Sequence, residues 1–87
     1  MKIEVYKFGK ILISRPAGRE AYLSARAYLF TKKIDRVEFD FRDVKVLSPS
    51  WISEFISNLK NDFPDAIIVY LPSDNPTVSQ SLAMLEY

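Results

Sequence analysis

The chain has 87 residues, 48% of them hydrophobic, with 12 Lys or Arg against 11 Asp or Glu and neither Cys nor His. This length supplies one hydrophobic core but not two, so we expect a single domain over residues 1–87. The missing Cys excludes a disulfide framework and thiol catalysis, and the missing His removes the commonest general base and metal ligand. The composition therefore favours a non-catalytic protein that needs no metal or cofactor.

The charge is unevenly distributed along the chain. Residues 1–36 carry nine Lys or Arg and three acids, whereas residues 37–87 carry three and eight. We expect the two halves to fold together and mix their charges, which argues against a nucleic-acid partner. No apolar run approaches the roughly 18 residues of a membrane span, so we expect a cytoplasmic protein.

The N-terminal third predicts two strands and a helix. The alternating residues Ile3 and Val5, followed by Ile11 and Ile13, predict an antiparallel hairpin that turns near Gly9. The segment 14–20 contains a Pro and a Gly and is expected to be an irregular loop, followed by a helix over residues 19–33. Two arginines near this helix start are candidates for binding an anion, Arg15 and Arg19.

The central segment predicts a strand, a turn and a second helix. Val37, Phe39 and Phe41 alternate with Glu38 and Asp40, which indicates a strand with one face buried and its acidic face in solvent. Apolar residues at helical spacing then form one stripe: Ile52, Phe55, Ile56 and Leu59.

The start of this second helix is the best candidate for a functional site. Pro49 suits the first helical position, which makes Ser48 the N-cap. Ser50 then lies in the first turn, where free N–H groups and the helix dipole favour an oxyanion.

The last third predicts a strand and a short helix. The apolar run 66–71 indicates a central strand, and Asn75 and Pro76 suit the N-cap and first residue of a closing helix. The element order is thus ββαβαβα. It predicts an α/β domain with a mixed, mostly parallel four-stranded sheet and helices mainly on one face.

The segment 39–52 resembles the signature of STAS domains, the fold of anti-sigma-factor antagonists. It is most similar to a smaller STAS-like family of uncharacterised function. In the antagonists, a kinase related to histidine-kinase ATPases phosphorylates the second Ser of an Asp-Ser-Ser-Gly-Leu motif, and the phosphate breaks binding. That Ser matches Ser50, whereas Ser48, Pro49 and Trp51 stand at the Asp, first Ser and Gly positions.

The resemblance implies a regulatory module that binds a protein partner through the helix start at residues 48–54. The expected partner is a histidine-kinase-like ATPase or a sigma-type regulator, and phosphorylation of Ser50 is the expected switch. Candidate contact residues are Trp51, Glu54 and Asp43; the indole of Trp51 could equally pack inward. The alternative is a small-anion or nucleotide site that uses the same helix start with Arg15 or Arg19.

Overall fold

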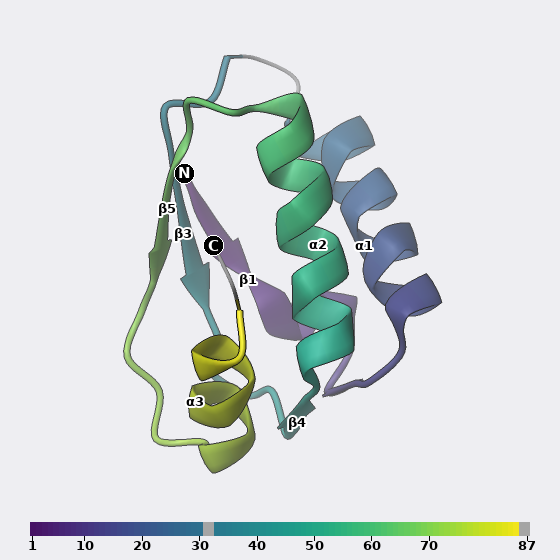
Figure 1. Ribbon diagram of the computed structural model, residues 1–87, viewed down its shortest axis with the longest axis vertical. Coiled ribbons are helices and arrows are strands. Elements are labelled where there is room, and N and C mark those ends of the chain that lie inside the picture. Colours follow the sequence, from purple (N-terminus) through teal and green to yellow (C-terminus); the bar gives the residue numbers. More distant parts are fainter. Residues whose placement is uncertain (31–32, 86–87) are drawn as a thin grey trace.

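A computed structural model describes residues 1–30 and 33–85 (Figure 1). The described residues form three α-helices, one 3-10 helix and five short strands. In chain order these are β1 (Lys2–Glu4), η1 (Val5–Phe8), β2 (Ile11–Leu12), α1 (Arg15–Tyr28), β3 (Arg36–Asp40), β4 (Val46–Leu47), α2 (Pro49–Asp62), β5 (Ile67–Tyr70) and α3 (Pro76–Ala83).

The strands make two parallel sheets. One has the order β1-β3-β5 and the other pairs β2 with β4, with Ile11 opposite Val46. The small α/β domain is therefore confirmed, but the single four-stranded sheet is wrong. The strand β4 lies in the segment that the sequence predicts to be a turn. The central strand of the larger sheet is β3, and not β5 as predicted.

The predicted N-terminal hairpin is also wrong. β1 and β2 do not pair with each other, because η1 and Gly9 redirect the chain between them. Gly9 has a φ of 138°, a conformation that side-chain-bearing residues rarely adopt. Each strand instead joins a later one, β1 beside β3 and β2 beside β4, so both pairings are non-local and parallel.

The helix α1 begins earlier than predicted. Ser14 is its N-cap and accepts a hydrogen bond from the Ala17 N–H at 3.1 Å, and Pro16 falls in the first turn, where a missing N–H has no cost. The segment that we expected to be a loop is thus helical from Arg15. The helix ends at Tyr28, and residues 31–32 of the predicted range lie outside the described part of the chain.

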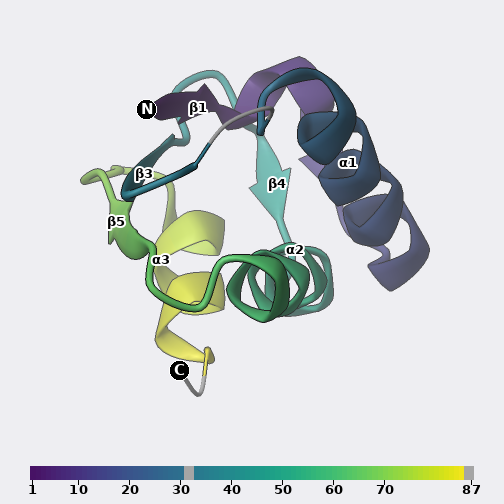
Figure 2. The same cartoon turned by 90° about the horizontal axis from the view of Figure 1, so that it is seen from above.

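The helices α1 and α2 run side by side on one face of the β1-β3-β5 sheet (Figures 1 and 2). Phe55 of α2 is fully buried at the centre of the core that they cover. Its ring lies 5.5 to 5.7 Å, centroid to centroid, from four other rings, which belong to Phe8, Tyr22, Phe39 and Trp51. The expected inward alternation of Val37, Phe39 and Phe41 is confirmed, with all three buried.

A polar contact joins the far ends of the same two helices. The buried Tyr22 of α1 donates its hydroxyl hydrogen to Asp62 of α2 at 2.6 Å, and Arg26 forms an ion pair with that carboxylate at 3.3 Å. Burial of the ring, together with this hydrogen bond, raises the pKa of Tyr22. The hydroxyl therefore stays protonated and remains a donor at every physiological pH.

The closest approach of α1 and α2 is at Gly18. A Cβ atom there would lie 2.5 Å from the carbonyl oxygen of Trp51. Glycine is therefore required at this position because the two backbones touch, and the contact brings the first turns of the two helices together.

We expect Gly18→Ala to destabilise the protein by about 1–3 kcal/mol, because the added methyl group must push the helices apart. Without this contact, Gly→Ala inside a helix would stabilise by about 0.4–1 kcal/mol, so the sign of the change is diagnostic. Urea unfolding followed by circular dichroism measures it. Ser24→Ala, at an exposed position of α1, is the control and should change stability by less than about 0.5 kcal/mol.

Candidate functional site

The start of α2 is fixed by Ser48. Its hydroxyl accepts a hydrogen bond from the Trp51 N–H at 3.2 Å and donates one to the carbonyl oxygen of Ile13 at 2.9 Å. Its own N–H donates to the carbonyl oxygen of Leu12 at 2.9 Å. Ser48 is thus the N-cap, as predicted, and it also ties α2 to the end of β2, where α1 begins.

Trp51 is a core residue. Only 1% of it is exposed, and its ring stacks on Phe55 and contacts Phe8. The interpretation of Trp51 as a projecting partner contact is therefore wrong. The backbone of Trp51 lies against α1 at Gly18, while its indole lies against Phe8 of η1 and Phe55 of α2.

Ser50 remains on the surface of the same turn. It follows Pro49 at the second helical position, and its side chain is exposed. By contrast, Ser48 caps the helix and Trp51 is buried in the core. The hydroxyl of Ser50 therefore lies in solvent at the N-terminus of α2, where the helix dipole favours added negative charge.

Glu54 lies one helical turn after Ser50 and is held from two sides. Arg15 of α1 donates to Oε1 at 2.9 Å, and Asn58 donates to Oε2 at 3.0 Å. The hydrogen bond from Arg15, followed by that from Asn58, lowers the pKa of Glu54. The structure thus brings together three predicted site residues from two helices: Arg15, Ser50 and Glu54.

Arg15 and Arg19 differ in what they contact. The guanidinium of Arg15 is occupied by Glu54. Arg19 is exposed and forms no ion pair among residues 1–30 and 33–85, although its charge also contributes to the lowered pKa of Glu54. Both predicted anion-binding candidates therefore lie beside the start of α2, but only Arg19 is free of a carboxylate partner there.

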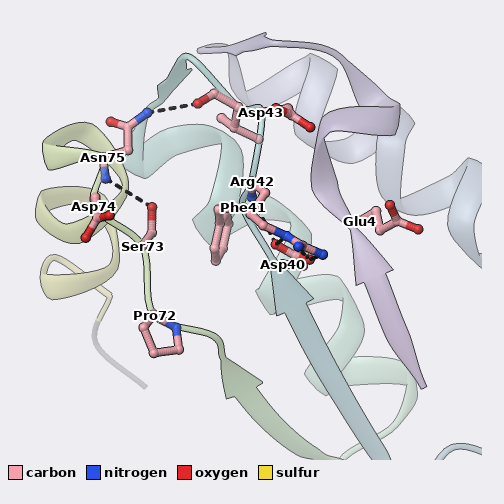
Figure 3. A pocket seen from close by; sticks show the side chains of 10 residues that line it. Glu4, Asp40, Phe41, Arg42, Asp43, Pro72, Ser73, Asp74 and Asn75 are labelled. Carbon is pink, nitrogen blue, oxygen red and sulfur yellow. Dashed lines mark hydrogen bonds and ion pairs between the residues drawn. The ribbon is translucent and has the colours of Figure 1, made fainter.

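Asp43 lies elsewhere. It is exposed, has a positive φ of 68° in the β3–β4 loop, and lines a hollow of about 560 Å³ at the carboxyl ends of β1, β3 and β5 (Figure 3). The segment that precedes α3, residues 72–75, forms the opposite wall of this hollow, and no residue of the Ser48–Glu54 segment lines it. The structure does not join Asp43 to the other predicted contact residues.

The same hollow contains a buried carboxylate that sequence reasoning placed in solvent. Asp40 is 5% exposed, because the side chains of Arg42 and Lys2 cover it. The prediction failed because alternation identifies the face on which Asp40 lies but not the long side chains that fold over it. Hydrogen bonds from the side chain and the backbone N–H of Arg42 lower the pKa of Asp40 to about 2.

A family model described as a STAS-like domain of unknown function (DUF4325) matches residues 27–77, which is more than half of the chain. The chain belongs to this family. The match includes β3, β4, α2 and β5, and therefore the helix start that carries Ser48 and Ser50. It confirms the resemblance given by residues 39–52. Comparisons with the curated proteins and with the solved structures each found no matching protein.

Among residues 1–30 and 33–85 of this STAS-like chain, no helix is long and apolar enough to cross a membrane.

Sequence reasoning also missed an exposed apolar surface that precedes both helix starts. It is formed by Ile11 and Ile13 of the β2 segment with Val46 of β4. Its sequence signal is the unbroken apolar run Ile11-Leu12-Ile13, in which a strand must turn some apolar side chains away from the face that Leu12 occupies.

The two serines at the start of α2 should respond differently to substitution. We expect Ser48→Ala to destabilise the protein by about 1–2 kcal/mol, since it removes the cap and the tie to Ile13. Ser50→Ala should change stability by less than about 0.5 kcal/mol because the side chain is exposed. Urea unfolding of both variants measures the difference, and equal losses would contradict the assignment of the cap.

Asp40 should make stability depend on acid pH. Its pKa falls from the ordinary 3.8 to about 2 on folding, so its contribution is fully present above about pH 4 and disappears as the pH falls toward 2. We expect Asp40→Asn to lower the free energy of unfolding by about 1–2 kcal/mol at neutral pH. The value is reduced for solvent screening, because the side chains of Arg42 and Lys2 are exposed.

Urea unfolding near pH 7 and near pH 2 tests this dependence. The loss caused by Asp40→Asn should shrink at the lower pH. The exposed Asp65 provides a matched control, since Asp65→Asn should have a small effect at both. A loss for Asp40→Asn that is the same at both pH values would refute a charge-dependent role.

Proposed function

We propose that this STAS-like chain is a non-catalytic regulatory module that binds a protein partner through the surface at the start of α2. The observation that carries the proposal is that neighbouring residues within one helical turn have different roles. Ser48 caps the helix and Trp51 fills the core, whereas Ser50 is left exposed with no evident part in folding. An exposed hydroxyl with no structural task is a suitable position for regulation.

Phosphorylation of Ser50 is the proposed switch. A phosphoserine adds a charge of about −1.5 to −2 at neutral pH, and the N-terminus of a helix tolerates such a charge without unfolding. Ser50 and Glu54 are four residues apart and share one face of α2, so the phosphate would lie near a carboxylate that Arg15 already holds. The modification would thus change the charge of the surface while leaving the fold intact.

The class of partner follows from the family resemblance. STAS domains of the antagonist type are modified by ATPases related to histidine kinases, so we propose such an ATPase, or a sigma-type regulator, as the partner. The contact surface of this chain would consist of Ser50, Glu54 and the adjacent start of α1. Trp51 has no part in it because it is buried.

A pull-down from the native host tests this proposal, with wild type, Ser50→Asp and Ser24→Asp as baits. Ser24 is an exposed serine on α1, so Ser24→Asp adds the same charge away from the start of α2. We expect wild type and Ser24→Asp to capture the same ATPase or regulator in equal amounts. Ser50→Asp should capture a different amount of it. Mass spectrometry identifies the bound protein, and the intact mass of the bait reports phosphorylation.

The outcomes separate the parts of the proposal. If Ser50→Asp binds the same partner as well as wild type does, Ser50 is not a switch and only the binding module remains. If no bait captures a regulator or an ATPase, the partner hypothesis fails.

A second candidate is a small-anion or nucleotide site at the same position. It is favoured by the adjacent first turns of α1 and α2 and by Arg19, which has no ion pair among the described residues. Thermal unfolding with ATP, GTP or inorganic phosphate tests it, since a ligand that binds only the folded state raises the melting temperature. Arg19→Ala should abolish that increase.

A further inference from the structure

The outer face of the two-stranded β2–β4 sheet is apolar and exposed. Ile11 and Val46 are register partners and are 63% and 36% exposed, and Ile13 at the end of β2 is 58% exposed. The residues that alternate with them, Leu12 and Leu47, point into the core and are 3% and 2% exposed. Lys10 and Lys45 directly precede Ile11 and Val46, so alternation directs their side chains to the opposite side of the strands. We call the three exposed apolar residues, together with these two lysines, the β2–β4 surface.

The two lysines of this surface immediately precede the neighbouring strands β2 and β4. The N–H of Lys45 donates to the carbonyl oxygen of Lys10 at 2.8 Å, so the two backbones are in direct contact. Both side chains are exposed, and neither forms an ion pair with a residue that the structure describes. Like charges on adjacent strands repel each other, and an anionic occupant would relieve this repulsion.

One edge of the β2–β4 sheet is occupied and the other has no neighbouring strand. On the β4 side, α3 supplies two side chains to Leu47: Thr77 accepts its N–H at 3.1 Å, and Ser81 donates to its carbonyl oxygen at 2.7 Å. On the β2 side, no third strand is present among the described residues.

The main chain of β2 shows which groups face that edge. The carbonyl oxygens of Lys10 and Leu12 accept hydrogen bonds from the β4 side. Neighbouring residues of a strand point their main-chain groups to opposite sides, so the N–H and C=O of Ile11 face away from β4.

We propose that the β2–β4 surface docks an extended segment of a partner protein in which apolar and acidic residues alternate. The segment adds a strand beside β2, pairs with the main chain of Ile11, and lays apolar side chains against Ile11 and Ile13. Its carboxylates lie against Lys10 and Lys45. The charge of the surface favours an acidic segment, because Lys10 and Lys45 are exposed and form no ion pair with a described residue.

This inference rests on the proposed function, since it describes the partner of the same module. The β2–β4 surface adjoins the start of α2 through Ser48, which donates to the carbonyl oxygen of Ile13. A partner segment on β2 would therefore end close to Ser50. Phosphate on Ser50 would then repel the carboxylates of that segment, which gives the switch its sign: modification weakens binding.

The experiment uses the full chain, labelled on isoleucine and valine methyl groups, and a short acetylated peptide of alternating Glu and Val as the probe. We expect the peptide to shift the NMR signals of the Ile11, Ile13 and Val46 methyl groups, and binding to weaken as salt is added. A peptide with Lys in place of each Glu is the matched control and should not bind.

Charge reversal on the protein provides the second test. The double variant Lys10→Glu with Lys45→Glu should weaken binding of the acidic peptide by at least about ten-fold, because both favourable contacts become repulsive. Lys33→Glu makes the same change at an exposed residue outside this surface and should leave the affinity unchanged. Circular dichroism confirms that each variant is folded.

Three results would overturn the inference: equal binding of the acidic and basic peptides, unchanged affinity of the double variant, or methyl shifts caused by self-association of the chain instead of by peptide. Its failure can be told apart from failure of the proposed function. A captured partner could be lost with Ser50→Asp yet retained by the folded double variant Ile11→Lys with Ile13→Lys. That result would uphold the proposed function and overturn the docking surface.

Discussion

The parallel pairing of β2 with β4 determines the geometry of this domain. It brings two chain segments that are 35 residues apart to the same level, since Ile11 lies opposite Val46, and each segment then enters a helix through a capping serine. The helices α1 and α2 consequently start side by side and touch at Gly18. Ser48 links the two starts, because it caps one helix and bonds to the residue before the cap of the other.

This close contact decides what is exposed at the start of α2. The backbone of α1 lies against that of Trp51, the indole of Trp51 is buried in the core, and the small side chain of Ser50 is exposed. The same proximity lets Arg15 reach across to Glu54. The surface at the start of α2 thus combines an exposed hydroxyl, an ion pair between two helices and adjoining apolar strands.

The hollow at the carboxyl ends of β1, β3 and β5 differs in character from the start of α2. It is lined by carboxylates and by Arg42, and the most buried of these carboxylates, Asp40, is already neutralised by Arg42 and Lys2. The polar contacts in that region hold together the carboxyl ends of the strands and the start of α3, through Asn75 and the backbone of the β3–β4 loop (Figure 3). These contacts are structural, whereas the exposed groups on which the proposed function rests lie at the nearby start of α2.

The sequence by itself determined the features that depend on neighbouring residues. It predicted the inward alternation of Val37, Phe39 and Phe41, the capping of α2 by Ser48, and the start of α3 at Asn75 and Pro76, because alternation, caps and prolines act within a few residues. Only the tertiary structure decided which strands pair, that Gly18 lies against the backbone of Trp51, that Trp51 is buried and that Asp40 is covered. Each of these depends on a contact between segments far apart in the chain, and no local pattern specifies which distant backbone or side chain will be there.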